Sequence, residues 1–187
     1  MILFIDTHAS LITIALKYKD KIYKKEKESE CSHSIYTMPM IQEIFEENNL
    51  NIHDLTKIIV INGPGSFTGI RIGLSIAKTL AYALKIDINT ISSLTAYLIS
   101  SDLQENKKAV IEDNKGYYIS VFDKDNNVII PEFYSETDNY DYKLVDNKLN
   151  IEKIINYCEK LKSENPHFIK ANYIKKIGVE KWSKKKY

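Results

Sequence analysis

The residues whose types and spacing could do chemistry gather in one block, Gly63-Pro64-Gly65-Ser66-Phe67-Thr68-Gly69-Ile70-Arg71-Ile72-Gly73. The block holds four of the six glycines in the chain and its single arginine, Arg71. Glycines at the start of a helix let backbone N–H groups approach an anion, and a guanidinium adds a rigid fork of donors. The chemistry that such a block would support is the binding of a phosphate or another anion.

The spacing of these glycines does not match the standard phosphate motifs. A P-loop requires Gly-x-x-x-x-Gly-Lys-Ser/Thr, but Thr68 takes the place of its second glycine and no lysine follows. The dinucleotide fingerprint Gly-x-Gly-x-x-Gly also fails, because its third glycine comes one residue late, at Gly69. Ser66 lacks the flanking glycines of a nucleophile elbow. Two interpretations remain: a non-standard anion site, or a tight turn that packs closely against a neighbour.

A strand and a helix must position the block. Residues 57–62 are apolar and β-branched, which predicts a buried strand, and a helix is predicted from the block to about Leu84. Small and bulky residues form two ridges along this helix: Gly69, Gly73, Ala77 and Ala81 in one, and Ile72, Ile76, Leu80 and Leu84 in the other. A ridge of small residues allows close helix packing. Either the protein's own sheet and a neighbouring helix, or a helix of a partner, would cover these ridges.

The order of the predicted elements indicates an α/β fold built on a mixed sheet. Residues 1–104 contain predicted strands at 2–6, 11–17, 21–27, 57–62 and 86–91, and helices at 33–48, from the glycine block to about Leu84, and at 92–102. This order is that of the ribonuclease H-like lobe found in actin-like (ASKHA) folds. Residues 105–187 are predicted to form a second, truncated lobe with strands at 109–112, 117–122 and 128–134, a helix at 151–162 and a basic tail.

Composition sets limits on the class of function. The chain has 187 residues with 26 basic and 25 acidic side chains, so a nucleic-acid or membrane surface over the whole protein is not expected. Cys31 and Cys158 have no metal-site spacing and suit a reducing compartment. No signal-peptide pattern or membrane-spanning apolar run is evident. We therefore expect a cytoplasmic protein. Its lysine-rich tail, which includes Trp182, would either contact RNA phosphates or form a solvated end.

The histidines do not suggest a metal or hydrolase site. The chain contains His8, His33, His53 and His167, and Thr37 stands one helical turn after His33, where a second metal ligand would be needed. No serine or cysteine is spaced with them as a nucleophile and base. We therefore predict no metal and no catalytic residues.

The glycine block and the strand before it resemble the TsaB (YeaZ) family of bacterial tRNA threonylcarbamoyladenosine biosynthesis proteins. Phe4-Ile5-Asp6-Thr7 is similar to the family's opening strand and turn, and His33-Ser34 is similar to the start of its first helix. Asp113-Asn114-Lys115-Gly116-Tyr117-Tyr118 looks like a degraded family motif, with Lys115 where arginine is usual, and Asn172-Tyr173-Ile174-Lys175 resembles the terminal Tyr-Leu-Arg. The resemblance extends over residues 1–118 and is weaker beyond.

The resemblance implies a non-catalytic subunit of a tRNA-modifying complex. TsaB-like proteins form homodimers, or pair with their catalytic paralogue TsaD, which transfers the threonylcarbamoyl group to tRNA; the ATPase TsaE binds the assembled pair. The chain alone would bind no cofactor, ATP or ADP would belong to the complex, and tRNA would be reached indirectly through it. Asp6, Thr7 and Gly63 would be vestiges of a nucleotide site.

The two long helices are the predicted partner face. Its residues are His33, Met38, Ile41 and Phe45 from the first helix, and Gly69, Ile72, Gly73, Ile76, Ala77 and Leu80 from the second. The turn itself is assigned to Gly63, Pro64, Gly65, Ser66, Phe67, Thr68, Gly69 and Arg71. Arg71 would either brace the turn against Asp6 or pair with a partner carboxylate.

Two other classes of protein are alternatives. An actin-like small-molecule kinase or ATPase would need a second phosphate loop, for which Asp113-Asn114-Lys115-Gly116 is the candidate, although this turn could equally close a hairpin. A peptidase-like protein would need a metal pair or a nucleophile with its base, which the spacing of the histidines does not offer.

Overall fold

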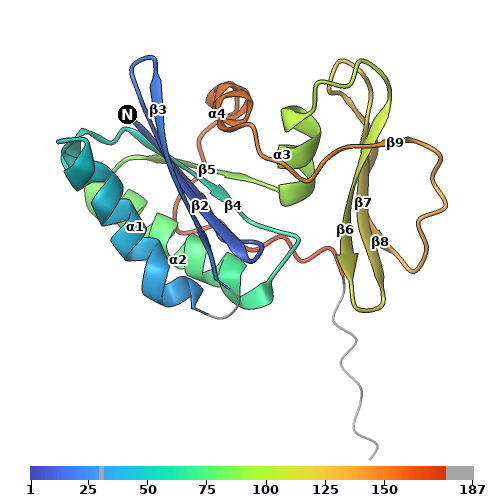
Figure 1. Ribbon diagram of the computed structural model, residues 1–187, viewed down its shortest axis with the longest axis horizontal. Helices are drawn as coiled ribbons and strands as arrows, with labels where there is room; N and C mark the ends of the chain where they lie inside the picture. Colours follow the sequence, from blue (N-terminus) through green and yellow to red (C-terminus); the bar gives the residue numbers. More distant parts are fainter. Residues whose placement is uncertain (30–31, 176–187) are drawn as a thin grey trace, which may run out of the picture.

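Five strands form a mixed sheet in the order β3-β2-β1-β4-β5 (Figure 1). The strands are β1 (Ile2–Asp6), β2 (Leu11–Tyr18), β3 (Lys21–Glu28), β4 (Lys57–Ile61) and β5 (Asp87–Ile91). The first three pair antiparallel, whereas β4 runs parallel to both β1 and β5. This is the ribonuclease H-like arrangement of actin-like folds, as predicted from the order of elements.

The computed structural model describes residues 1–29 and 32–175. Cys31 and the tail from residue 176, with Trp182, lie outside the described residues.

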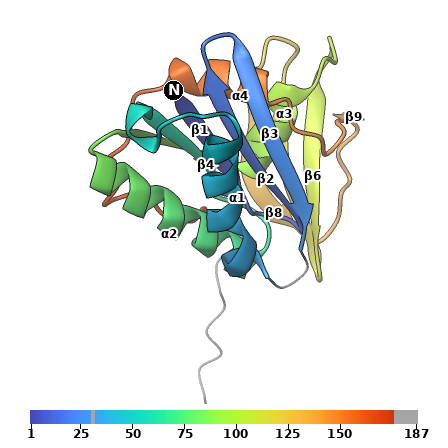
Figure 2. The same cartoon turned by 60° about the vertical axis from the view of Figure 1, so that its left-hand side comes forward.

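Helices cover both faces of the first sheet. On one face lie α1 (His33–Glu47) and α2 (Phe67–Leu84), which Figure 2 shows side by side. Successive strand residues alternate between the two faces. In β1, for example, Leu3 and Ile5 pack with α1 and α2, and Phe4 packs with the helix on the opposite face.

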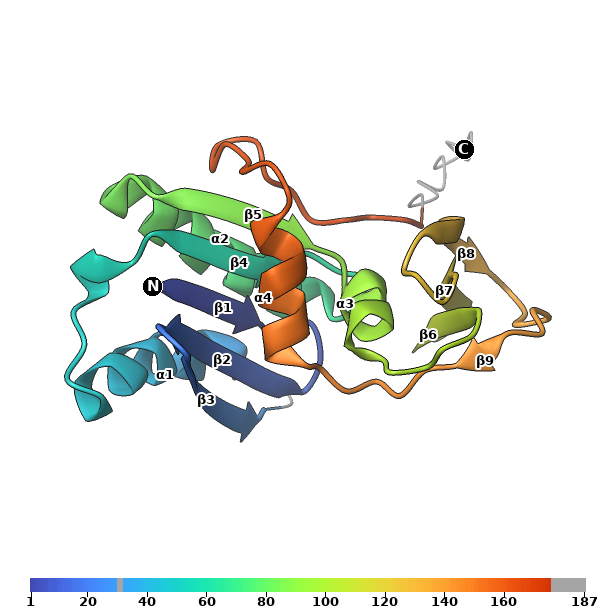
Figure 3. The ribbon, with the colours of Figure 1, turned by 90° about the horizontal axis from the view of Figure 1, so that it is seen from above.

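That opposite helix is α4 (Ile151–Glu159), which comes late in the chain and returns to the first sheet (Figure 3). Its buried residues Ile154, Ile155 and Cys158 contribute to the same apolar cluster as Phe4. The chain then continues along β5, where Glu164 forms an isolated bridge with Ile88. The predicted lobe boundary at residue 104 stays a prediction, but the packing of α4 means that part of residues 105–187 completes the core of the first sheet.

The second sheet has the order β8-β7-β6-β9. Its strands are β6 (Lys107–Asp113), β7 (Gly116–Phe122), β8 (Val128–Ser135) and β9 (Lys143–Leu144). Helix α3 (Ser93–Ser100) lies between the two sheets and packs Leu94 and Leu98 in one cluster with Ala109 and Phe122 of the second sheet (Figure 1). The three predicted strands of this part are confirmed, and a short 3-10 helix (Ile52–Asp54) follows α1.

Candidate functional site

The glycine block packs against the loop that follows β1. Ser66 caps α2 by accepting a hydrogen bond from the Gly69 N–H at 3.2 Å, and its own N–H donates to the His8 carbonyl at 2.7 Å. A Cβ at Gly65 would collide with the His8 carbonyl, and one at Gly69 would collide with that of Thr7. The close-approach interpretation of the glycines is therefore confirmed at these positions.

The three residues assigned to a vestigial nucleotide site have internal partners. The Thr7 hydroxyl donates to the Gly69 carbonyl at 2.7 Å, and the Gly63 carbonyl accepts from the Ser93 N–H at 2.9 Å. Asp6 is buried and bonds to His8. These contacts tie the turn to β1 and α3, and a nucleotide role for Asp6, Thr7 and Gly63 stays a prediction.

A buried carboxylate–imidazole–phenol chain lies beside the turn. His8 Nδ1 is 2.6 Å from Asp6 Oδ1, and His8 Nε2 is 2.8 Å from the Tyr97 hydroxyl. An ionised carboxylate only accepts, so the bond to Asp6 requires a hydrogen on His8 Nδ1, and in the tautomer that carries it there Nε2 accepts from the phenolic O–H. Burial, together with the Asp6 charge, raises the pKa of Tyr97 well above its usual range, so the phenol serves as a hydrogen-bond donor.

The hydrogen-bonded contact of Asp6, His8 and Tyr97 was not predicted from the sequence. Asp6 and His8 are two residues apart, which is a weak signal, and Tyr97 lies 89 residues after His8 in α3. Their contact exists because α3 packs against the end of β1. The phenol, however, is held protonated, and Ser66 uses its hydroxyl to cap α2. The arrangement provides a buried polar contact between α3 and the end of β1.

His8 and Tyr97 line a cleft between the two sheets. The cavity has a volume of about 830 Å³, and Glu112, Asp113 and Tyr118 form its other wall. A second cavity of about 460 Å³ shares Asp113 and Tyr118 with the first and extends the cleft toward the start of α2. The two cavities thus lie side by side between the glycine block and the second sheet.

The candidate second phosphate loop is a hairpin turn. Asp113 pairs with Gly116 in the register of β6 and β7, so Asn114 and Lys115 form a two-residue connection. The Asp113 carboxylate accepts a hydrogen bond from Lys175 Nζ at 3.0 Å, and this bond holds the pKa of Asp113 below its usual range. The hairpin interpretation is confirmed, and a phosphate-binding role for this turn, which the kinase or ATPase alternative requires, stays a prediction.

Arg71 does not brace the turn against Asp6, and that expectation is wrong. Its guanidinium carbon lies 3.6 Å from the centre of the Phe67 ring, and its Nε donates to the Tyr173 hydroxyl at 2.9 Å. Asp6 is too deeply buried, and already bonded to His8, to receive it. Arg71 instead connects the start of α2 to the last described segment of the chain.

The predicted partner face is largely internal. Six of its ten residues are buried: His33, Ile41, Phe45, Gly69, Gly73 and Ala77. Met38 is exposed. His33 Nε2 is 2.7 Å from the Ala9 carbonyl, and the small ridge of α2 packs on β1 because glycine and alanine let the helix lie close to the sheet. Of the two alternatives for this ridge, the structure shows the protein's own fold as the cover at Gly69 and Gly73.

An apolar surface remains on the outer side of these helices. The side chains of Ile35 and Met38 in α1 are 64% and 41% exposed. Ile72, Ile76 and Leu80 of α2 are half-buried. Sequence reasoning did not select Ile35 for the partner face, because an apolar residue on an amphipathic helix is normally assigned to the core.

A groove adjoins this surface along α1. It has a volume of about 540 Å³ and is lined by Met38, Ile41, Gln42, Phe45, Glu46, Asn49, Leu50, Asn51 and Ile52. Five of these lining residues are apolar, and the other four, Gln42, Glu46, Asn49 and Asn51, are polar. We refer to Ile35, Met38 and this groove together as the α1 surface.

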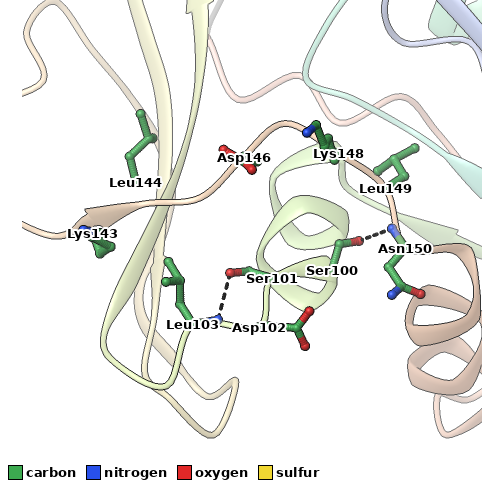
Figure 4. Close-up of a pocket in the computed structure, with 10 residues that line it drawn as sticks. All are labelled: Ser100, Ser101, Asp102, Leu103, Lys143, Leu144, Asp146, Lys148, Leu149 and Asn150. Atoms are coloured by element: carbon green, nitrogen blue, oxygen red, sulfur yellow. Dashed lines mark hydrogen bonds between the residues drawn. The ribbon is translucent and has the colours of Figure 1, made fainter.

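Another cavity, of about 630 Å³, lies at the end of α3 (Figure 4). Ser101 Oγ accepts from the Leu103 N–H at 3.2 Å, and Ser100 Oγ accepts from the Asn150 N–H at 2.8 Å. The side chains of Asp102, Asp146 and Lys148 do not converge on one point (Figure 4). The bond between Ser100 and Asn150 joins α3 to the residue that caps α4, which is a structural role, whereas the bond between Ser101 and Leu103 is local to the loop after α3.

Within residues 1–29 and 32–175, no group of three or more histidine, cysteine or acidic side chains is placed to hold a metal ion. No helix in the described part of the chain is both long and apolar enough to cross a membrane.

Several curated proteins resemble this chain. The family model described as TsaD: tRNA N6-adenosine threonylcarbamoyltransferase matches residues 26–120, half of the chain. The Bacillus subtilis tRNA threonylcarbamoyladenosine biosynthesis protein TsaB is 40% identical over 99 residues, which cover 50% of this chain and 41% of that protein. TsaB of Buchnera aphidicola subsp. Baizongia pistaciae is 34% identical over 119 residues, 61% of this chain and 53% of that protein. The chain thus spans about half the length of these relatives.

Two solved structures from Pseudomonas aeruginosa share the fold. A protein described as similar to peptidase YEAZ has a TM-score of 0.80 at 16% identity, covering 93% of this chain and 99% of that one. YeaZ has a TM-score of 0.65 at 21% identity, covering 71% and 67%. These two structures show the fold alone. By the matching family model and the TsaB relatives, the chain belongs to the TsaD family, and within it to the TsaB (YeaZ) proteins.

Proposed function

We propose that this protein is a non-catalytic scaffold that binds a TsaD-like transferase through the α1 surface and so supports threonylcarbamoylation of tRNA. In this proposal the transferase performs the chemistry and contacts tRNA, a TsaE-like ATPase binds the assembled pair, and ATP or ADP belongs to the complex. The chain alone forms a homodimer through the same surface and acts in the cytoplasm.

The observation that carries the proposal is the exposure of Ile35 and Met38 beside an apolar groove. Burying such side chains against a partner stabilises an interface by about 25 cal/mol per Å² of apolar area. Methionine adapts its shape to different neighbours, which suits a surface that accepts either a twin or a paralogue. The protonated phenol of Tyr97 and the capping role of Ser66 support a binding function over a hydrolytic one.

Mixing the purified protein with the TsaD-like protein of the same organism tests this proposal. Size-exclusion chromatography with light scattering should give a one-to-one complex. Met38→Glu should weaken it roughly a hundredfold or more, because a carboxylate buried without a partner costs about 3 kcal/mol or more. Val128→Glu is the matched control, since Val128 is exposed on the second sheet, away from α1.

Two results would contradict the proposal. One is the absence of a complex with the wild-type protein. The other is equal weakening by Met38→Glu and Val128→Glu, which would mean that added charge, and not the α1 surface, determines binding.

A further inference from the structure

The segment of residues 165–175 runs antiparallel along one side of α2. Lys78 Nζ donates to the carbonyls of His167 and Ile169 at 3.5 and 3.4 Å. Toward the end of α2, the rings of Tyr82 and His167 lie 5.0 Å apart between their centres. At its start, Arg71 bonds to Tyr173. The helix and the segment together form one continuous surface.

Exposed aromatic side chains gather on this surface. In the described part of the chain, the exposed large aromatic residues are Phe67, Tyr82, Phe168 and Tyr173, with exposed fractions of 49–75%. All four belong to α2 or to the segment beside it. The distance along α2 from Phe67 to Tyr82 is about 22 Å, at a rise of roughly 1.5 Å per residue. Exposed aromatic rings are therefore concentrated on a single strip.

The charge of this strip is entirely positive. Residues 67–86 and 165–175 contain no aspartate or glutamate. Arg71 and Lys78 are seven residues apart, which places them on one side of α2 two turns apart, and Lys85 follows as the C-cap residue directly after the helix. Lys170 is exposed on the neighbouring segment. Within residues 1–29 and 32–175, Arg71 forms no ion pair, so its charge is available to an anion.

We propose that this strip binds single-stranded RNA. Its members are Phe67, Arg71, Lys78, Tyr82, Lys85, Phe168, Lys170 and Tyr173. Aromatic rings and a guanidinium plane stack on unpaired bases, and a line of cations follows the phosphates. Arg71 unites the two functions, since it already stacks on Phe67 and keeps N–H donors beyond the one used by Tyr173. The choice of RNA over single-stranded DNA rests on the proposed function.

The strip is separate from the proposed partner surface. None of its members belongs to α1 or to the residues that line the groove of the α1 surface. Substitutions in the strip should therefore leave association with a TsaD-like protein unchanged. Failure of one proposal is thus distinguishable from failure of the other.

Fluorescence anisotropy with a labelled oligoadenylate tests the strip on the full chain without partners. Phe67→Leu and Tyr173→Leu should each weaken binding roughly five- to hundredfold, the range measured for loss of one stacked base. Lys85→Gln should reduce the slope of log affinity against log salt by about 0.7, since one phosphate contact is lost. Lys115→Gln removes an exposed lysine from the β6–β7 turn and is the charge-matched control, with the slope unchanged.

Three results would overturn the proposal. The first is that the wild-type protein does not bind the oligoadenylate. The second is that Lys85→Gln and Lys115→Gln have equal effects on binding. The third is that double-stranded RNA binds as tightly as the single strand, since paired bases cannot stack on the strip. The thermal unfolding temperature of each variant should match that of the wild type. If a leucine variant fails to fold, the RNA affinity of Lys85→Gln still tests the proposal, because Lys85 is exposed.

Discussion

Gly73 of α2 lies directly against Thr7, so that a Cβ at Gly73 would collide with the Thr7 hydroxyl oxygen. Thr7 is fully buried and its hydroxyl donates to the Gly69 carbonyl, so it cannot move aside without losing this bond. The two residues fix how closely α2 approaches the end of β1. Substitutions at Gly73 therefore report on the core of the protein and not on a partner interface.

Gly73→Ala should lower the free energy of unfolding by about 1–3 kcal/mol, the usual cost of overpacking a well-packed core. Urea unfolding measures it. Ser75→Ala on the exposed side of α2 is the control and should change stability by less than about 0.5 kcal/mol. A gain of about 1 kcal/mol for Gly73→Ala, as expected at an unconstrained helical glycine, would contradict the close contact with Thr7.

Tyr97→Phe should destabilise the protein by about 1–3 kcal/mol, because it leaves the buried His8 Nε2 without a donor. Tyr157→Phe is the control: the described residues provide no hydrogen-bond partner for that hydroxyl, so a smaller loss is expected. A double-mutant cycle with His8→Ala should give a coupling energy of about 0.5–3 kcal/mol. Additive effects of the two substitutions would refute the hydrogen bond between His8 and Tyr97.

The thiol of Cys158 should be unreactive in the folded protein. Burial raises its pKa to about 12, so almost no thiolate exists at neutral pH, and the side chain is enclosed by α4 and the first sheet. In a Cys31→Ser background, iodoacetamide should label Cys158 slowly in buffer and fast in denaturant. Fast labelling of the folded variant would show that α4 does not stay packed on the sheet.

The contact between Asp113 and Lys175 should make stability depend on pH in acid. The hydrogen bond from Lys175 lowers the pKa of Asp113 below its unfolded value of 3.8, so the contact stabilises the fold above that pH. Its contribution should disappear as the pH falls through the lower folded pKa.

Thermal midpoints measured from neutral pH into acid test this expectation. Asp113→Asn should be less stable than the wild type near neutral pH and equal to it in strong acid. Glu136→Gln, at an exposed carboxylate in the loop after β8, should follow the wild type throughout. A constant difference between Asp113→Asn and the wild type at every pH would mean that the charge of Asp113 has no part in the contact.

Local patterns in the sequence determined the elements and their order. The apolar run at 57–62 predicted β4, the glycine block predicted the turn into α2, and the order of elements gave the ribonuclease H-like sheet. These features were readable because strand and helix periodicity, and the special backbone freedom of glycine, act between residues close in the chain. The family resemblance depended on the same short block.

Which surfaces these elements cover was decided by the tertiary structure. The small ridge with Gly73 looked equally suited to a partner helix or to the protein's own sheet, and only packing on Thr7 distinguishes them. Tyr97 joins Asp6 and His8, and Tyr173 joins Arg71, over separations of 89 to 102 residues. Such contacts arise from the way α3 and the last segment fold back on the first sheet, because burial is a property of the whole packed chain and no local spacing records it.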